Sequence, residues 1–260
     1  MTALSDDSRH LKPAALPPPP DLSGHQRDAL LLDFDGTLVD IAPRPDAITV
    51  PAGLPATLAA LSEMLGGRLA IVSGRSIADL DRHLGPVPVA MAGSHGGEFR
   101  EAGSGEARAL VDPFPAQALT ELAELAEDLG GLLVEEKPTG AAIHFRDAPD
   151  LEERVRSNVE AIAREHGIKV KHGKMVAELV VAGADKGAAV AHLMKLDRFA
   201  GSRPLFAGDD VTDEDAFRAV GAFGGGGVLV GPLRATAACW HLPDTAAVHI
   251  WLENALNEHA

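Results

Sequence analysis

One stretch of the chain indicates the fold, and it is Ala29-Leu30-Leu31-Leu32-Asp33-Phe34-Asp35-Gly36-Thr37. Its first four residues form a short continuous apolar run, which is typical of a strand buried on both faces of a sheet. Two aspartates, two positions apart, follow this run directly, and Gly36 breaks it. Carboxylates at close range need a cation or a shared proton, so the pair predicts a functional site at the end of the strand.

The same order of apolar strand, polar cluster and amphipathic helix recurs along the chain. Residues 54–65 have leucines at helical spacing, and residues 69–72 form a second apolar run before Ser73-Gly74-Arg75. Residues 87–92 predict a third strand, which their prolines place toward a sheet edge. Such alternation predicts an α/β fold with a parallel sheet flanked by helices, whose functional residues lie just past the carboxyl ends of the strands.

The middle of the chain has a different pattern. Residues 115–129 and 150–166 each have the spacing of an amphipathic helix, and short strand-like segments lie between and after them. This pattern predicts a smaller α+β domain at 108–183, inserted as a cap into a core made of residues 28–107 and 184–260. Residues 1–27 are rich in proline and are expected to form a disordered tail.

Composition limits the partners of the protein. The chain has 260 residues, with 23 Lys and Arg against 38 Asp and Glu, which gives a net charge of −15. So acidic a surface argues against binding to nucleic acid or to an anionic membrane. Cys239 is the single cysteine, which excludes a disulfide within the chain and a cysteine-based metal site. The sequence shows no secretion signal and no membrane span, so we expect a cytoplasmic protein. We also expect a monomer.

A second pair of aspartates extends the first. Asp209 and Asp210 follow an apolar segment at 204–207, where another parallel strand is expected. Together with Asp33 and Asp35 they make a hard, oxygen-only ligand set, which suits Mg²⁺. A calcium loop or a plain turn is the alternative for the first pair. The positions that need Gly and Glu in a calcium loop hold Leu38 and Arg44, which leaves the plain turn.

These motifs resemble those of the haloacid-dehalogenase-type (HAD) hydrolases, in the same order along the chain. The four matching segments are Leu32-Asp33-Phe34-Asp35-Gly36-Thr37-Leu38, Ser73-Gly74-Arg75, Asp185-Lys186-Gly187 and Gly208-Asp209-Asp210. More narrowly, the chain resembles the trehalose-6-phosphate phosphatases of that superfamily over about residues 28–255. The narrower resemblance rests on Gly93-Ser94-His95-Gly96 with Glu98, on Glu135 and Lys137, on His144 and Arg146, on Gly173-Lys174 with Glu178, and on Gly208-Asp209-Asp210-Val211-Thr212-Asp213-Glu214.

The resemblance implies a Rossmann-like core and a specific set of roles there. Asp33 is expected to attack phosphorus, and Asp35 to act as general acid and then as general base. Mg²⁺ is expected on the Asp33 carboxylate, the Asp35 backbone carbonyl and the Asp209 carboxylate. Asp210 and Asp213 are expected to orient the waters of the metal ion. The phosphate oxygens are expected to bind Thr37, Ser73, Gly74 and Lys186.

The same resemblance implies that the cap binds the sugar. The expected sugar-binding residues are Glu135, Lys137, His144, Arg146, Lys174 and Glu178, with Glu98 contributing from the core. A solvated sheet face is the alternative explanation for the cap residues. Val180-Val181 stands where relatives often carry a basic residue and Pro, so a contact from that position is not expected. The roles of Arg75 and His95 are left open.

The predicted function is therefore hydrolysis of trehalose 6-phosphate, a small sugar phosphate, with Mg²⁺ as cofactor. Two alternatives remain at this point. One is a related phosphatase for another sugar phosphate, such as sucrose 6-phosphate. The other is a non-catalytic sugar-phosphate sensor or partner module, against which every expected catalytic position is filled.

Overall fold

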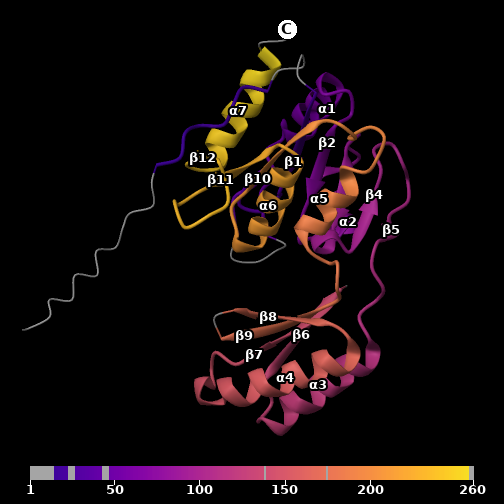
Figure 1. Ribbon diagram of the computed structural model, residues 1–260, viewed down its shortest axis with the longest axis vertical. Coiled ribbons are helices and arrows are strands. Elements are labelled where there is room, and N and C mark those ends of the chain that lie inside the picture. Colours follow the sequence, from indigo (N-terminus) through magenta and orange to yellow (C-terminus); the bar gives the residue numbers. More distant parts are fainter. Residues whose placement is uncertain (1–14, 23–26, 43–46, 138, 174, 258–260) are drawn as a thin grey trace, which may run out of the picture.

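The computed structural model describes residues 15–22, 27–42, 47–137, 139–173 and 175–257. Two layered units lie one above the other and are joined by two stretches of chain (Figure 1). The upper unit holds an eight-stranded sheet with the order β12-β11-β10-β1-β2-β3-β4-β5. The lower unit holds a four-stranded sheet with the order β6-β7-β9-β8.

The large sheet is parallel from β12 to β3, and β4 and β5 extend it in antiparallel fashion. Its strands are β1 (Asp28–Leu32), β2 (Leu69–Val72), β3 (Ala90–Gly93), β4 (Glu98–Arg100), β5 (Arg108–Ala109), β10 (Arg203–Gly208), β11 (Gly226–Val230) and β12 (Trp240–Leu242). The parallel arrangement follows from the alternation of strands and helices in the sequence. It brings the carboxyl ends of β10, β1, β2 and β3 to one edge.

Helices cover both faces of this sheet. One hydrophobic cluster joins Leu30 and Leu32 to the helices on one face, which are α1 (Leu54–Met64), α2 (Ile77–Leu84) and α7 (Thr245–Asn257). The helices α5 (Lys186–Leu193) and α6 (Glu214–Ala222) share the other cluster with Ala29 and Leu31. This explains why β1 is apolar at every one of these positions rather than at alternate ones. None of the helices in the described part of the chain is long and apolar enough to cross a membrane.

The place of β3 differs from the prediction. This strand begins at Ala90, and it lies inside the sheet between β2 and β4. Pro86 and Pro88 come before the strand and remove no hydrogen bond from it. The expectation of an edge strand was therefore wrong.

The small sheet is antiparallel throughout and is covered on one face only. Its strands are β6 (Leu133–Lys137), β7 (Gly140–His144), β8 (Lys169–Gly173) and β9 (Val176–Val180). The helices α3 (Ala116–Asp128) and α4 (Glu152–His166) pack on the face away from the large sheet, so the uncovered face is turned toward it (Figure 1). We call this unit the cap. It begins after Ala109 and not at 108, because β5 still pairs with β4.

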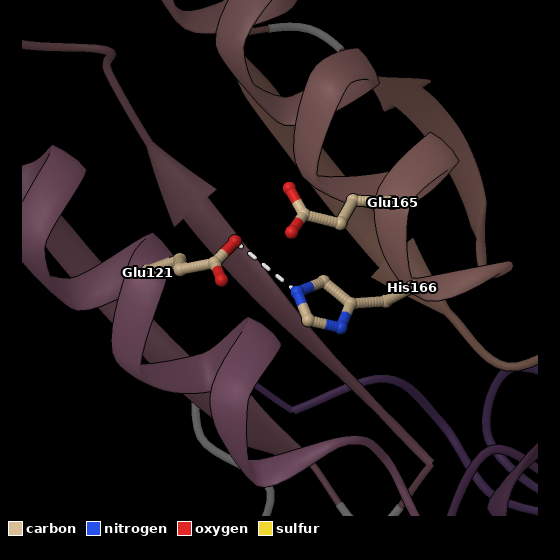
Figure 2. Close-up of side chains that lie close together, drawn as sticks. All are labelled: Glu121, Glu165 and His166. Carbon is tan, nitrogen blue, oxygen red and sulfur yellow. Dashed lines mark hydrogen bonds and ion pairs between the residues drawn. The ribbon is translucent and has the colours of Figure 1, made fainter.

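The cap has a core of its own, in which Leu122 of α3, Val155 of α4 and Ile143 of β7 are buried together. A hydrogen bond of 3.1 Å between Glu121 Oε2 and His166 Nε2 links α3 to the end of α4, beside the carboxylate of Glu165 (Figure 2). The cap is therefore held together independently of the core.

The prediction of a disordered tail is wrong for residues 15–22. The carbonyl of Pro17 accepts a hydrogen bond from His241 N (3.0 Å), and that of Pro20 accepts one from Trp251 Nε1 (2.9 Å). Leu22 is fully buried in the cluster that contains Trp251 and Leu252. Proline cannot donate a backbone hydrogen bond, but its carbonyl can still accept one. Residues 1–14 and 23–26 lie outside the described part of the chain.

Candidate active site

The predicted core residues meet at the carboxyl edge of the large sheet. Asp33 follows β1, Ser73 follows β2, Ser94 follows β3 and Asp209 follows β10. These four strands are direct neighbours, in the order β10-β1-β2-β3. Parallel strands place the residues after their carboxyl ends in one crevice, where open α/β sheets bind their ligands.

A buried lysine lies at the centre of this site. Lys186 Nζ is 2.8 Å from Asp33 Oδ1 and 2.6 Å from Asp213 Oδ1. All three side chains are at most 5% exposed. Lys186 is the first residue of α5, where the helix dipole disfavours a cation, and Asp185 caps the helix by accepting from Ala188 N (2.7 Å). The two carboxylates explain why a lysine can be buried there.

Both carboxylate oxygens of Asp213 accept hydrogen bonds from other residues. Its Oδ1 binds Lys186, and its Oδ2 accepts a hydrogen bond from Asp210 N (2.9 Å). The Asp210 side chain in turn accepts from Val211 N, so both residues cap the short helix η4 (Val211–Asp213). The predicted contacts of Asp210 and Asp213 with metal-bound water stay a prediction.

Burial changes the acidity of these groups. Burial raises the pKa of Asp33 to about 8, although the Lys186 charge acts in the opposite direction. Burial also raises the pKa of Asp209 to about 6, and the charges of Asp213 and Asp210 add to this effect. For Lys186, burial alone lowers the pKa, but the charges of Asp33 and Asp213 outweigh it and raise the pKa overall.

The residues present fit a divalent cation. Asp33, Asp209 and Asp213 offer carboxylate oxygens that all lie within 4.8 Å of one another. When all three are ionised, the single Lys186 charge leaves two negative charges uncompensated. A hard divalent ion would balance them, and oxygen ligands suit Mg²⁺. Its binding would also favour the ionised forms of Asp33 and Asp209.

The turn after Asp35 is built around this cluster. Gly36 has φ +77°, and a Cβ atom there would lie 2.1 Å from Asp209 Oδ2. Only glycine allows this backbone to approach Asp209 so closely. The hydroxyl of Thr37, in the same turn, is buried and has no hydrogen-bond partner among the described residues. Its contact with phosphate stays a prediction.

Asp35 is bound by a residue whose role the sequence left open. Arg75 Nε lies 2.7 Å from Asp35 Oδ2, and Arg75 Nη2 lies 2.8 Å from Asp35 Oδ1. Arg75 Nη1 is 2.6 Å from Asp79 Oδ2. Hydrogen bonds to the Asp35 carboxylate raise the pKa of Arg75. Both oxygens of Asp35 are therefore engaged in this structure by a bidentate, charge-assisted pair.

The segments predicted to bind phosphate contact one another. Ser73 is 1% exposed, and its Oγ accepts a hydrogen bond from Arg75 N (3.1 Å). Glu98 Oε1 accepts from Ile77 N and from Ser94 Oγ, each at 2.9 Å. Glu98 thus fastens the loop after β3 to the start of α2. Its predicted contact with the sugar is not tested by this arrangement.

The uncovered face of the cap holds four of the predicted sugar-binding residues. Lys137 Nζ is 2.6 Å from Glu178 Oε1, and His144 Nε2 is 3.1 Å from Glu135 Oε2. The Lys137 side chain of β6 reaches Glu178 of β9 across the strand β7, which lies between them. On β7, Gly140 pairs in register with Lys137, and Ala142 pairs in register with Glu178. These small residues form the floor of the face between Lys137 and Glu178. Arg146 is exposed just after β7, and Lys174 lies outside the described residues.

The cap and the core meet around this face. Thr139 Oγ1, in the turn between β6 and β7, donates to the carbonyl of Ser94 (3.3 Å). On the α6 side, a cavity of about 450 Å³ separates Lys169 and Lys171 of the cap from Asp215 and Arg218 of the core. The polar face of the cap thus lies across an open cleft from the core.

Three residues with clear contacts were absent from the sequence-based set. Asp79 has a local signal, since it lies four residues after Arg75 at the spacing of a helical ion pair. Lys171 also has a local signal in the sequence, because it alternates with Lys169 on β8. In the structure it pairs in register with Glu178. Arg234 has none. It bonds the carbonyl of Asp210 (2.7 Å) and pairs with Glu214 from a loop 20 residues further along the chain.

Comparison with known proteins agrees with this geometry. The trehalose-phosphatase family model matches residues 31–239. The chain belongs to the trehalose-phosphatase family. It is 39% identical to a probable trehalose-phosphate phosphatase of Sinorhizobium fredii, over 85% of this chain and 84% of that protein. It is 35% identical to the trehalose-6-phosphate phosphatase of Escherichia coli, over 90% of this chain and 88% of that one.

Solved structures agree with the family and confirm the predicted fold class. The trehalose-6-phosphate phosphatase of Aspergillus fumigatus superimposes with a TM-score of 0.73 at 26% identity, covering 92% of this chain and 99% of that one. A HAD phosphatase of Bacteroides thetaiotaomicron has the same fold, with a TM-score of 0.64 at 19% identity, over 90% of this chain and 95% of that one. The α/β core with an inserted cap is therefore the HAD fold.

Proposed function

We propose that this chain is a Mg²⁺-dependent phosphatase that hydrolyses trehalose 6-phosphate to trehalose and phosphate, in trehalose biosynthesis. One observation carries the proposal. Asp33 is buried beside Lys186, Asp209 and Asp213 at the edge of the large sheet, and the uncovered face of the cap is turned toward that sheet. Family membership and the named activities of the relatives support the substrate.

The first step forms an aspartyl-phosphate. A carboxylate oxygen of Asp33 attacks phosphorus, and the bond between phosphorus and the sugar oxygen breaks. The leaving oxygen takes its proton from Asp35. Lys186 fixes the orientation of the Asp33 carboxylate through its contact with Oδ1. Because Arg75 binds both oxygens of Asp35 in this structure, we expect at least one of these contacts to be exchanged for a contact with the substrate before this step.

The second step regenerates the enzyme. A water molecule attacks phosphorus and gives its proton to Asp35, and the bond from phosphorus to Asp33 breaks. Asp33, Asp209 and the Asp35 carbonyl would hold Mg²⁺. That ion would supply positive charge against the dianionic phosphate. Ser73, Gly74 and Lys186 would hold the other phosphate oxygens, and Thr37 would assist them.

The cap supplies recognition of the sugar. Sugar hydroxyls each donate and accept hydrogen bonds, so they match the paired acids and bases on the uncovered sheet face. Glu135 with His144, and Lys137 with Glu178, lie on either side of the small residues of β7. We expect Arg146, Lys174 and Glu98 to join these contacts when the cleft closes over substrate.

The test is phosphate release from trehalose 6-phosphate by the full chain. We expect turnover with Mg²⁺ and loss of turnover in EDTA. In Asp33→Asn, kcat should fall to below about a thousandth of the wild-type value. The control Asp128→Asn, on the exposed side of α3, should keep wild-type activity. Activity that persists in Asp33→Asn would exclude the nucleophile. Preference for sucrose 6-phosphate or glucose 6-phosphate in the same assay would exclude the substrate and retain the chemistry.

A further inference from the structure

The loop after β3 has an unusual backbone. Ser94 has φ +51° and His95 has φ +56°, so two consecutive residues other than glycine occupy the left-handed region. Side chains with a Cβ rarely adopt this conformation, and it persists only where the surroundings enforce it. Two hydrogen bonds do so here, from Ser94 N to Arg75 O (2.8 Å) and from His95 N to Ser73 O (2.9 Å).

This backbone places the His95 ring on the phosphate-binding segment. A Cβ atom at Gly74 would lie 2.7 Å from Cε1 and 2.8 Å from Nε2 of the imidazole. The absence of a side chain at Gly74 therefore makes room for the ring. Since Gly74 N is expected to bind a phosphate oxygen, the ring lies beside the place where a phosphate ester leads out of the core.

Charged residues of the cap also act electrostatically on the His95 ring. The charges that act on it come from Lys186 in the core and from Glu178, Lys171 and Lys137 on the cap face. The loop itself contacts the cap, because Thr139 donates to Ser94 O. His95 is thus a core residue at the junction between the phosphate-binding groups and the predicted sugar-binding face.

The imidazole is suited to bind an uncharged hydroxyl. Burial lowers the pKa of His95 to about 4, and the charge of Lys186 adds to this effect, so the ring is neutral at pH 7. A neutral imidazole offers one donor and one acceptor. Neither ring nitrogen has a hydrogen-bond partner within the described ranges. His95 is only partly buried, so its ring is accessible to a ligand whose hydroxyl can pair with these nitrogens.

We propose that His95 is a substrate-binding residue, whose imidazole hydrogen-bonds a hydroxyl of the sugar that carries the phosphate. The inference rests on the proposed function and adds a determinant on the core side. It predicts that His95 favours sugar phosphates over phosphate esters without hydroxyls. Neither the backbone strain nor the contact with Gly74 would be needed if His95 only filled space in the loop.

The test compares two substrates in two variants of the full chain. The measured quantity is the ratio of kcat/KM for trehalose 6-phosphate to kcat/KM for p-nitrophenyl phosphate. In His95→Gly, which accepts the same backbone and removes the ring, we expect this ratio to fall about tenfold, or about 1.4 kcal/mol. His95→Asn keeps a donor and an acceptor and tolerates the left-handed region, so most of the ratio should return.

A matched control is His172→Asn. This histidine lies on β8 but contacts Glu160 of α4, on the covered face of the cap. It should leave the ratio at the wild-type value. If His95→Gly lowers both kcat/KM values by the same factor, or neither of them, the proposed hydroxyl contact is wrong.

Failure of the proposed function gives a different result. If the wild-type enzyme prefers another sugar phosphate, the same ratio measured with that substrate still decides the role of His95. If wild-type enzyme hydrolyses p-nitrophenyl phosphate but no sugar phosphate, both the function and the hydroxyl contact are excluded. That outcome is recognised from wild-type enzyme alone.

Discussion

Lys186 shows how a single buried charge organises the site. Its ammonium group contacts two carboxylates from segments far apart in the chain, Asp33 and Asp213. The sequence indicated an unusual lysine, because a cation at a helix start is electrostatically unfavourable without an anion nearby. It could not show that Asp213 is one of the two partners, since that contact depends on how α5 packs against η4.

Replacement of this lysine should destabilise the protein as well as inactivate it. Lys186→Met leaves Asp33 and Asp213 buried without a cation, so we expect the free energy of unfolding to fall by about 3 kcal/mol. Urea denaturation without metal measures this change. The double variant Lys186→Met with Asp213→Asn should recover part of the loss, and Lys195→Met, on the exposed end of the same segment, should be neutral. A destabilisation that Asp213→Asn does not relieve would contradict this account.

The low pKa of His95 predicts a pH dependence of stability. The ring binds a proton at about pH 6.5 when unfolded and only at about pH 4 when folded. Between these values the unfolded state holds more protons, so the free energy of unfolding falls as pH decreases from about 6.5 to about 4. The upper limit of this loss is about 3 kcal/mol.

Other groups also titrate in this range, so the prediction concerns a difference. We expect the stability difference between wild type and His95→Asn to change by that amount between pH 7 and pH 4, measured by urea denaturation at each pH. A difference that is constant with pH would show that the folded protein accepts a proton at His95 without cost.

At the scale of elements, the uncovered face of the cap depends on the small residues of β7. Lys137 and Glu178 can pair across this strand because Gly140 and Ala142 lie between them. The alternation of side chains along β6 and β7 correctly placed Glu135 with Lys137 on one face. Their partners could not be predicted, because the strand order β6-β7-β9-β8 is not sequential.

A larger side chain on this floor should weaken sugar binding. Ala142→Val inserts two methyl groups beside the Lys137–Glu178 pair, so we expect KM for trehalose 6-phosphate to rise about tenfold or more. The valine suits a strand, so the cap should remain folded by circular dichroism. An equal rise in KM for p-nitrophenyl phosphate would indicate a disturbed phosphate site and would contradict the prediction.

At the scale of the whole molecule, most of the fold could be predicted. Apolar runs marked β1 and β2, and helical spacing marked α1, α3 and α4, because each buries a regular face. The interior position of β3 was missed because the prolines precede the strand. Residues 15–22 were missed because a proline-rich segment has no periodic pattern, although its carbonyls can bind to a folded surface.

The docked segment should contribute to stability. Leu22 is fully buried in the hydrophobic cluster that also contains α7, so Leu22→Ala should lower the free energy of unfolding by about 3 kcal/mol. Pro18→Ala, at an exposed position of the same segment, is the matched control. Thermal unfolding of the two variants measures the effect, and equal transition temperatures would show that the segment does not stabilise the core.

The pairing of β1 with β10 affects how the protein is made. Asp28 and Arg203, which face each other across these strands, are 175 residues apart in the chain. At about 5–20 residues per second, a ribosome needs roughly 9–35 s to synthesise the intervening segment. Throughout that time β1 is without one of its neighbours, whereas the cap, complete at Val180, can fold around its own core first. The nascent chain therefore exposes the strand that precedes Asp33 to chaperones until synthesis has passed the cap.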